Sequence, residues 1–185
     1  VAHAYHLLLN HGVKKENIVL MMYDDIANNE ENPYPGTLYN NPDRKVNYYE
    51  GLEIDYKGAD VTPENFLQIL KGNHSGVSGG SGRVLESGPN DDVFVYYTDH
   101  GDTGLVAFPD GELTSVDLND AIKEAHDLGK FRMMLLYIEA CMSGSMFENN
   151  ILPEDINVFA VTSANSTEYS WGAYCYGMLE DTCLG

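Results

Sequence analysis

Two apolar runs of the chain each end in residues that carry chemistry, and this pattern limits the fold more than any other feature. Residues 133–138 are followed by Glu139 and Cys141, and residues 93–97 are followed by His100. Apolar runs of this length are typical of strands buried on both faces, as in parallel sheets. The carboxyl ends of parallel strands meet at one edge of an open α/β sheet. We therefore expect Cys141 and His100 to lie at the same edge.

A thiol and an imidazole at one edge indicate nucleophilic catalysis. A thiol becomes a reactive thiolate near neutral pH beside a base or a positive neighbour, and imidazole supplies both. A free cysteine alone is more often a small buried apolar residue, and a lone histidine is more often structural. Because Cys141 and His100 follow strands of the same design, the sequence favours a catalytic pair.

Helical patterns alternate with the apolar runs. Thr62 followed by Pro63 is typical of a helix start, and residues 1–12 and 115–130 have apolar side chains at helical spacing. The residues expected on the core side of the 115–130 helix are Val116, Leu118, Ile122, Ala125 and Leu128.

Two further apolar runs, residues 18–23 and 158–163, are expected to be strands. Strands that alternate with helices predict an α/β fold with a mainly parallel sheet covered on both faces. Residues 28–56 are polar without sustained periodicity and are expected to form a long loop. The chain has no internal repeat or linker, so we expect one domain over residues 1–185.

The charge of the chain excludes some classes of partner. Ten Lys and Arg residues against 29 Asp and Glu residues give a formal net charge of −19. This charge argues against nucleic acid and against an anionic membrane surface as partners. Self-repulsion is relieved when carboxylates become protonated, so an acidic compartment suits the chain. No apolar run is long enough to span a bilayer.

The three cysteines leave two alternatives open. Cys175 and Cys183 could close a small loop as a disulfide with Cys141 free, or all three could be reduced thiols. N-glycosylation patterns begin at Asn73 and Asn165 and favour the secretory pathway, where disulfides form. No Cys-x-x-Cys pattern occurs, and we expect neither a metal nor a cofactor.

Four segments carry a family resemblance. YYTDHGDTG at residues 96–104 and YIEACMSGSM at residues 137–146, with MMYDDIA and NPYPG upstream, strongly resemble the legumains. These are also called asparaginyl endopeptidases or vacuolar processing enzymes, and the resemblance covers essentially the whole chain. It implies a caspase-like three-layer α/β/α sandwich, with its first strand upstream of Val1. It also implies cleavage after Asn, less readily after Asp, in acidic lysosomes or vacuoles.

The resemblance also implies roles for single residues near the two strand ends. Cys141 would be the nucleophile and His100 its base and acid. The backbone N–H groups of Gly101 and Cys141 would stabilise the oxyanion. Glu139 would line the pocket for the substrate Asn, and Asp99 is a succinimide candidate.

Near the C-terminus, the resemblance adds a pocket wall and a disulfide. Tyr169 stands where the family usually has Ser in the wall, and Ser170 and Gly172 are further substrate-binding candidates. In the family, the residue at the position of Gly172 influences the balance between hydrolysis and ligation, and glycine there is typical of members that act as proteases. Cys175 and Cys183 look like the disulfide pair of the plant-type enzymes, around a shorter loop.

The family's catalytic Asn and the Arg-His pair of its pocket fall upstream of Val1, and an acidic pocket residue falls beyond Gly185. We therefore expect a catalytic domain incomplete at both ends, with a signal peptide upstream. The expected partners are protein or peptide substrates with an exposed Asn, and a C-terminal prodomain as inhibitor. The alternatives are an asparaginyl peptide ligase, a lipid-anchor transamidase, or an inactive homologue that acts by protein binding. Intact His100, Cys141 and Glu139 argue against the last.

Overall fold

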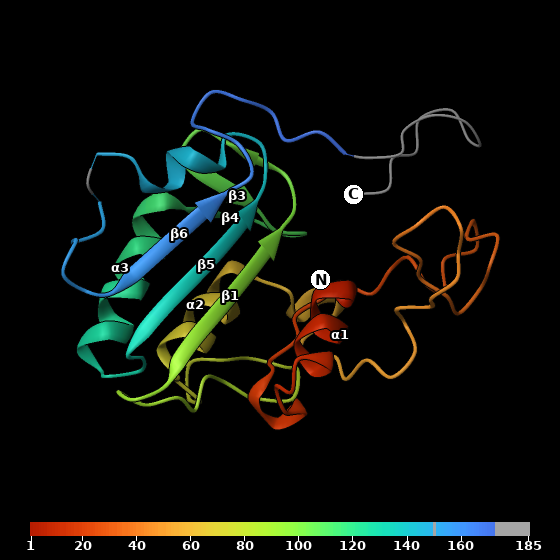
Figure 1. Cartoon of the computed structure of the whole chain (residues 1–185), viewed down its shortest axis with the longest axis horizontal. Helices are drawn as coiled ribbons and strands as arrows, with labels where there is room; N and C mark the ends of the chain where they lie inside the picture. The colour runs from red at the N-terminus through yellow and green to blue at the C-terminus, as the bar shows by residue number, and fades with distance from the viewer. Residues whose placement is uncertain (150, 173–185) are drawn as a thin grey trace.

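Three parallel strands form the main sheet, in the spatial order β1-β5-β6. They are β1 (Asp92–Thr98), β5 (Met133–Glu139) and β6 (Val158–Thr162). The structure is a computed structural model that describes residues 1–149 and 151–172. Figure 1 shows the three arrows side by side, pointing toward the same edge. The strands expected around residues 93–97, 133–138 and 158–163 are confirmed.

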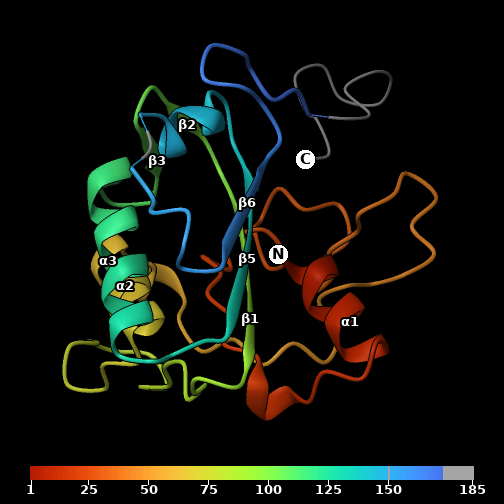
Figure 2. The same cartoon turned by 60° about the vertical axis from the view of Figure 1, so that its left-hand side comes forward.

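Two helices cover one face of this sheet and a third lies on the other side. Helices α2 (Pro63–Lys71) and α3 (Ser115–Asp127) pack together on one face, and α1 (Ala2–Asn10) lies across the sheet from them, beside β1 (Figure 2). The mixed α/β fold with a mainly parallel sheet is thus confirmed. The core between the sheet and α2 and α3 includes Val93, Val95, Tyr97, Leu118, Ile122, Ala125, Met134, Leu136 and Ile138.

Short elements complete the described part of the chain. An antiparallel sheet has the order β2-β3-β4, formed by β2 (Gly101–Asp102), β3 (Leu105–Ala107) and β4 (Glu112–Thr114). Three 3₁₀ helices are η1 (Lys15–Asn17), η2 (Gly58–Asp60) and η3 (Ser143–Phe147). Residues 28–56 form neither helix nor strand, as the sequence predicts.

Side-chain caps explain where the two covering helices begin. The Thr62 hydroxyl accepts a hydrogen bond from the Asn65 N–H at 3.1 Å, and Pro63 occupies the first turn of α2. Helix α3 begins in the same way, since the Thr114 hydroxyl accepts from the Asp117 N–H at 3.2 Å. Both caps satisfy an N–H group that has no partner within the helix.

The strand expected at residues 18–23 is wrong for this structure. The segment makes only an isolated bridge between Met21 and Tyr56. A cavity of about 540 Å³, lined by Met21, Phe94, Tyr96 and others, separates it from β1. The segment's backbone bonds to residues 55–58, as from the Met22 N–H to Tyr56 O at 3.0 Å, but these bonds form one isolated bridge and do not continue as a ladder, so the segment is not a strand.

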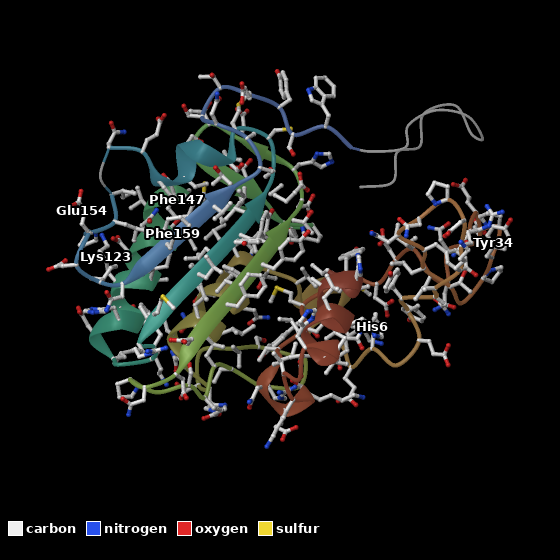
Figure 3. The ribbon with its side chains drawn as sticks, in the orientation of Figure 1. His6, Tyr34, Lys123, Phe147, Glu154 and Phe159 are labelled. Carbon is white, nitrogen blue, oxygen red and sulfur yellow. The ribbon has the colours of Figure 1, made fainter. Side chains whose placement is uncertain are left out.

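The sheet face turned away from α2 and α3 is largely open. Strand β5 alternates buried and less buried residues, so the expected burial on both faces is wrong. Phe159, labelled on β6 in Figure 3, is 65% exposed. Val116 and Leu128 of the α3 region are also exposed, contrary to expectation. The large exposed side chains on the open face are Phe94, Met133, Tyr137, Phe159 and Val161.

We expect Asn119→Ala to lower the free energy of unfolding by about 1–3 kcal/mol, because it removes the side-chain donor to the buried Met146 carbonyl group. Asn119 is fully buried, and its Nδ2 donates to Ser115 O at 2.6 Å and to Met146 O at 2.8 Å, which ties α3 to η3. Urea unfolding of the whole protein measures the change. Asp120→Ala removes an exposed partner of Lys123 from the same helix and is the control, with little expected effect. Equal losses in both variants would contradict the role of Asn119.

Candidate active site

The pairing register of β1 with β5 determines which residues meet at the carboxyl edge of the sheet. Thr98 pairs with Glu139, and each is the last residue of its strand. The Asp99 N–H also donates to Glu139 O at 3.2 Å, which extends the pairing by one residue. His100 and Cys141 each lie two residues beyond the pair, so both leave the sheet at the same level.

Gly101 packs directly against the backbone of Cys141. A Cβ atom at Gly101 would lie 2.6 Å from Cys141 O and 2.9 Å from the Ala140 Cβ, closer than real contacts allow. In an antiparallel pair of strands, hydrogen-bonded and non-hydrogen-bonded residue pairs alternate. The Ala107 N–H donates to His100 O at 2.9 Å, so these two residues form a hydrogen-bonded pair. The next pair, Gly101 with Val106, is therefore a non-hydrogen-bonded one. The Gly101 N–H is therefore not used by the β2-β3 ladder.

Cys141 begins a tight turn that is held from both sides. Its half-buried thiol donates to Ser170 O at 3.7 Å. The next residue, Met142, has a φ of 54°, in the left-handed region that costs a non-glycine residue about 1–2 kcal/mol. Its N–H donates to Glu168 O at 2.7 Å, and the Gly144 N–H donates to Ala164 O at 3.0 Å. These bonds fasten the turn to the segment that follows β6.

The loop that carries His100 is fixed through its backbone, while the side chain is exposed. The His100 N–H donates to Asp99 Oδ1 at 2.7 Å. The Tyr97 hydroxyl donates to Ala107 O in β3, and so connects β1 with the small sheet. Burial raises the pKa of Tyr97, which keeps the hydroxyl protonated as a donor.

Both carboxylate oxygens of Glu139 accept hydrogen bonds from hydroxyl groups. Thr98 Oγ1 donates to Oε2 at 2.7 Å, and Ser170 Oγ donates to Oε1 at 2.6 Å. Strand alternation places Thr98 and Glu139 on the open face, away from α2 and α3. The carboxylate is half-buried, and no ion pair of the described residues involves it.

The two aromatic neighbours of Ser170 lie outside this contact. Tyr169 is 59% exposed and Trp171 is 84% exposed, with ring centroids 5.8 Å apart. Gly172 follows and is exposed. The structure thus brings Ser170 to Glu139 and Cys141, whereas the Tyr169 side chain packs with Trp171 at the surface.

The remaining candidates are the cysteine pair and the glycosylation sites. Cys175 and Cys183 lie outside the described residues. Asn165 is exposed, and its Oδ1 accepts from the Thr167 N–H at 2.8 Å. Asn73 is half-buried, and its Nδ2, the atom that a glycan would modify, donates to Gln68 Oε1 at 2.7 Å.

Neither a metal cluster nor a membrane span is found in the described ranges. Residues 1–149 and 151–172 contain no group of three His, Cys, Asp or Glu residues that could hold a metal ion. Within the same ranges, no helix combines the length and the apolar character that crossing a bilayer requires.

Sequence reasoning missed two residues of this site. The sequence does not single out Thr98, because it precedes the more reactive Asp99 and His100, although counting back from equivalent strand ends places it opposite Glu139. Nothing in the side chain of Met142 indicates a left-handed backbone; the signal in the sequence is its place directly after Cys141, before Ser143 and Gly144.

The fold and this edge define an α/β protein with a thiol, an imidazole and a carboxylate grouped at the carboxyl ends of parallel strands. Comparison with known proteins supplies the family: the model of the peptidase C13 family matches residues 1–185. The chain therefore belongs to the peptidase C13 family.

Individual relatives agree with the family assignment. The chain is 50% identical over 192 residues to the vacuolar-processing enzyme of Vicia sativa, covering 100% of the chain and 38% of that relative. It is 50% identical over 184 residues to the legumain of Rattus norvegicus, covering 99% and 41%. It is 48% identical over 184 residues to the hemoglobinase of Schistosoma mansoni, covering 100% and 42%. The chain thus spans about two fifths of the length of these relatives.

We expect Gly101→Ala to destabilise the whole protein by about 1–3 kcal/mol, because its Cβ would strike Cys141 O and force β2 away from the turn. Denaturant unfolding measures the change. Gly88→Ala is the matched control, since a Cβ there meets only the Asp91 carboxylate at 3.8 Å and the backbone needs no positive φ. If the Gly101 variant is as stable as the Gly88 variant, the loops that carry Gly101 and Cys141 can move apart without loss of stability, and the prediction is wrong.

Proposed function

We propose that the whole protein cleaves peptide bonds after Asn, and less readily after Asp, through an acyl-enzyme formed on Cys141 with His100 as base and acid. The register of β1 with β5 carries this proposal, since it brings the thiol and the imidazole to one edge of the sheet. The carboxylate of Glu139, two residues before the nucleophile on the same strand, supplies the recognition of the substrate side chain.

In the first half of the reaction, His100 takes the proton of the Cys141 thiol, and the thiolate attacks the carbonyl carbon of the substrate Asn. A bond between Sγ and this carbon forms, and the carbonyl oxygen becomes an oxyanion. The bond to the leaving nitrogen then breaks as His100 returns the proton to that amine. In the second half, water loses a proton to His100 and attacks the thioester, which releases the acid and regenerates the thiol.

Backbone donors stabilise the oxyanion. Gly101 N–H is a suitable donor, because the ladder with β3 does not use it and the residue packs against Cys141. The Cys141 N–H is the second donor, at the start of the tight turn. Removing one donor from such a site in other enzymes typically costs about 2.7–4 kcal/mol of transition-state stabilisation.

Glu139 gives the pocket its preference for Asn. An Asn side chain presents an N–H₂ donor, and a carboxylate accepts from it; a cation in the whole protein would donate to the side-chain oxygen. Protonated Asp also has a donor and can replace Asn. Ser170, Gly172 and, at the exposed rim, Tyr169 form the adjoining wall, and glycine at position 172 favours hydrolysis over ligation.

The Asp99 carboxylate is a candidate for succinimide formation. Ring closure requires attack of the His100 backbone nitrogen on the Asp99 carboxyl carbon, with loss of water. The hydrogen bond from this N–H to Asp99 Oδ1 at 2.7 Å supports the proposal, because it holds the two groups next to each other.

The compartment and the partners are part of the same proposal. Its support is the net charge of −19, the two glycosylation patterns, and relatives whose names include vacuolar-processing enzyme. We place the whole protein in a lysosome or vacuole, reached through the secretory pathway. Its partners are protein substrates with an exposed Asn and a C-terminal inhibitory prodomain.

We expect Cys141→Ala and His100→Ala in the whole protein each to abolish cleavage of an Asn-containing peptide, because one removes the nucleophile and the other its base. Both variants should unfold near the wild-type temperature, since neither side chain lies in the buried core. His126→Ala is the control, because this histidine lies at the end of α3 and away from the carboxyl edge of the sheet. Substantial activity in either site variant would refute the proposed pair.

We expect the ratio of kcat/KM for a matched Asp and Asn peptide pair to fall about tenfold per pH unit above pH ~5, because the protonated fraction of an Asp of pKa ~3.9 falls at that rate. Ionised Asp offers Glu139 no donor and adds a like charge. Any ionisation of the enzyme that affects both peptides equally cancels in the ratio, so the two peptides control each other. A ratio that stays constant from pH ~5 to ~7 would count against recognition by Glu139.

A further inference from the structure

The carboxylate of Glu139 is held at both oxygens by hydroxyls that come from opposite directions. Thr98 reaches it from the neighbouring strand β1 at 2.7 Å, and Ser170 reaches it from the segment after β6 at 2.6 Å. In the described residues, these hydroxyls are the hydrogen-bond donors to the side chain of Glu139.

We propose that Thr98 and Ser170 are positioning residues that together form a hydroxyl clamp on Glu139 and set the direction in which it accepts the side-chain amide of the substrate. This inference rests on the proposed role of Glu139 in the pocket for Asn. It adds Thr98 to that pocket and gives Ser170, already placed in the wall, a role that acts through the carboxylate of Glu139.

The chemistry of the hydroxyl groups gives the clamp its effect. A hydroxyl has a single proton, and both Thr98 and Ser170 direct theirs to the carboxylate, which has about four lone-pair sites. One site on each oxygen remains for the substrate, and it can be used only by a donor. The terminal torsion of a free glutamate is broad, so an unclamped carboxylate samples many orientations. It would give up this rotational freedom when it binds the substrate, and that loss weakens binding.

Ser170 also connects the pocket with the nucleophile. Its hydroxyl donates to Glu139, and its carbonyl oxygen accepts from the Cys141 thiol at 3.7 Å. Side chains alternate in an extended segment, and here Tyr169 and Trp171 are exposed on the other side. The alternation at residues 169–171 therefore directs one hydroxyl inward and two aromatic rings outward.

The plain alternative is that the two hydrogen bonds only fasten the 163–172 segment to the sheet. In that case, removing either hydroxyl lowers stability but leaves the affinity for Asn unchanged. A clamp predicts a selective rise in KM, because a contact used in binding both substrate and transition state is weakened.

The test uses the whole protein with an Asn peptide at one mildly acidic pH. Thr98→Val removes the hydroxyl at nearly constant shape, Thr98→Ser keeps it, and Ser170→Ala removes the other one. We expect the first and third to raise KM about tenfold with kcat changed less than about threefold, and Thr98→Ser to stay within about twofold of wild type. Ser166→Ala is the control from the same segment, since its hydroxyl makes no hydrogen bond in the described residues.

Unchanged KM in Ser170→Ala, or a Thr98→Ser variant as impaired as Thr98→Val, would overturn the clamp. If Thr98→Val fails to fold in a thermal melt, Ser170→Ala decides alone. Glu139→Ala separates the two levels of the argument. If it keeps a normal KM for Asn, the proposed pocket fails; if it is impaired while Thr98→Val and Ser170→Ala are not, only the clamp fails.

Discussion

The parallel pairing of β1 with β5 is the interaction on which the site depends. Each residue of slip would move one strand end by about 3.3 Å and turn every side chain to the other face. Glu139 would then point toward α2 and α3, and His100 and Cys141 would no longer lie at one level. The apolar side chains that alternate along both strands therefore fix the active-site geometry through the core they fill.

The site itself is assembled from three stretches far apart in the chain, around residues 98–104, 139–145 and 163–172. Backbone hydrogen bonds do most of this assembly, as between Met142 and Glu168 and between Gly144 and Ala164. The missing Cβ at Gly101 allows the first stretch to approach the second. Ser170 joins the third to the others through both its hydroxyl and its carbonyl group. Reactive side chains can then be exposed while their backbone is held in place.

Much of this arrangement was predictable, because it follows from local patterns. The apolar runs specify β1, β5 and β6, and the pair Thr62 and Pro63 specifies the start of α2. The motifs around His100 and Cys141 predict the proposed nucleophile and its proposed base without knowledge of the fold.

What could not be predicted depends on partners distant in sequence. Residues 18–23 are apolar enough for a strand, but their pairing with residues 55–58 stops at one isolated bridge, between Met21 and Tyr56. Val116 and Leu128 fit the helical period, yet the rotation of α3 against the sheet leaves both exposed. Whether the side chain of Ser170 or that of Tyr169 faces Glu139 depends on how the extended segment packs against the sheet. The sequence of the segment does not contain that information.

The open face of the sheet has a consequence for the colloidal behaviour of residues 1–185 in solution. Phe159 and its neighbours form an apolar surface on a molecule with a net charge of −19. Mutual repulsion keeps such molecules apart, and it acts over a Debye length of about 10 Å at 0.1 M salt and about 3 Å at 1 M. Salt therefore removes the barrier to contact while it strengthens apolar association. This polypeptide should be most dispersed at low ionic strength, and light scattering should rise as salt is added.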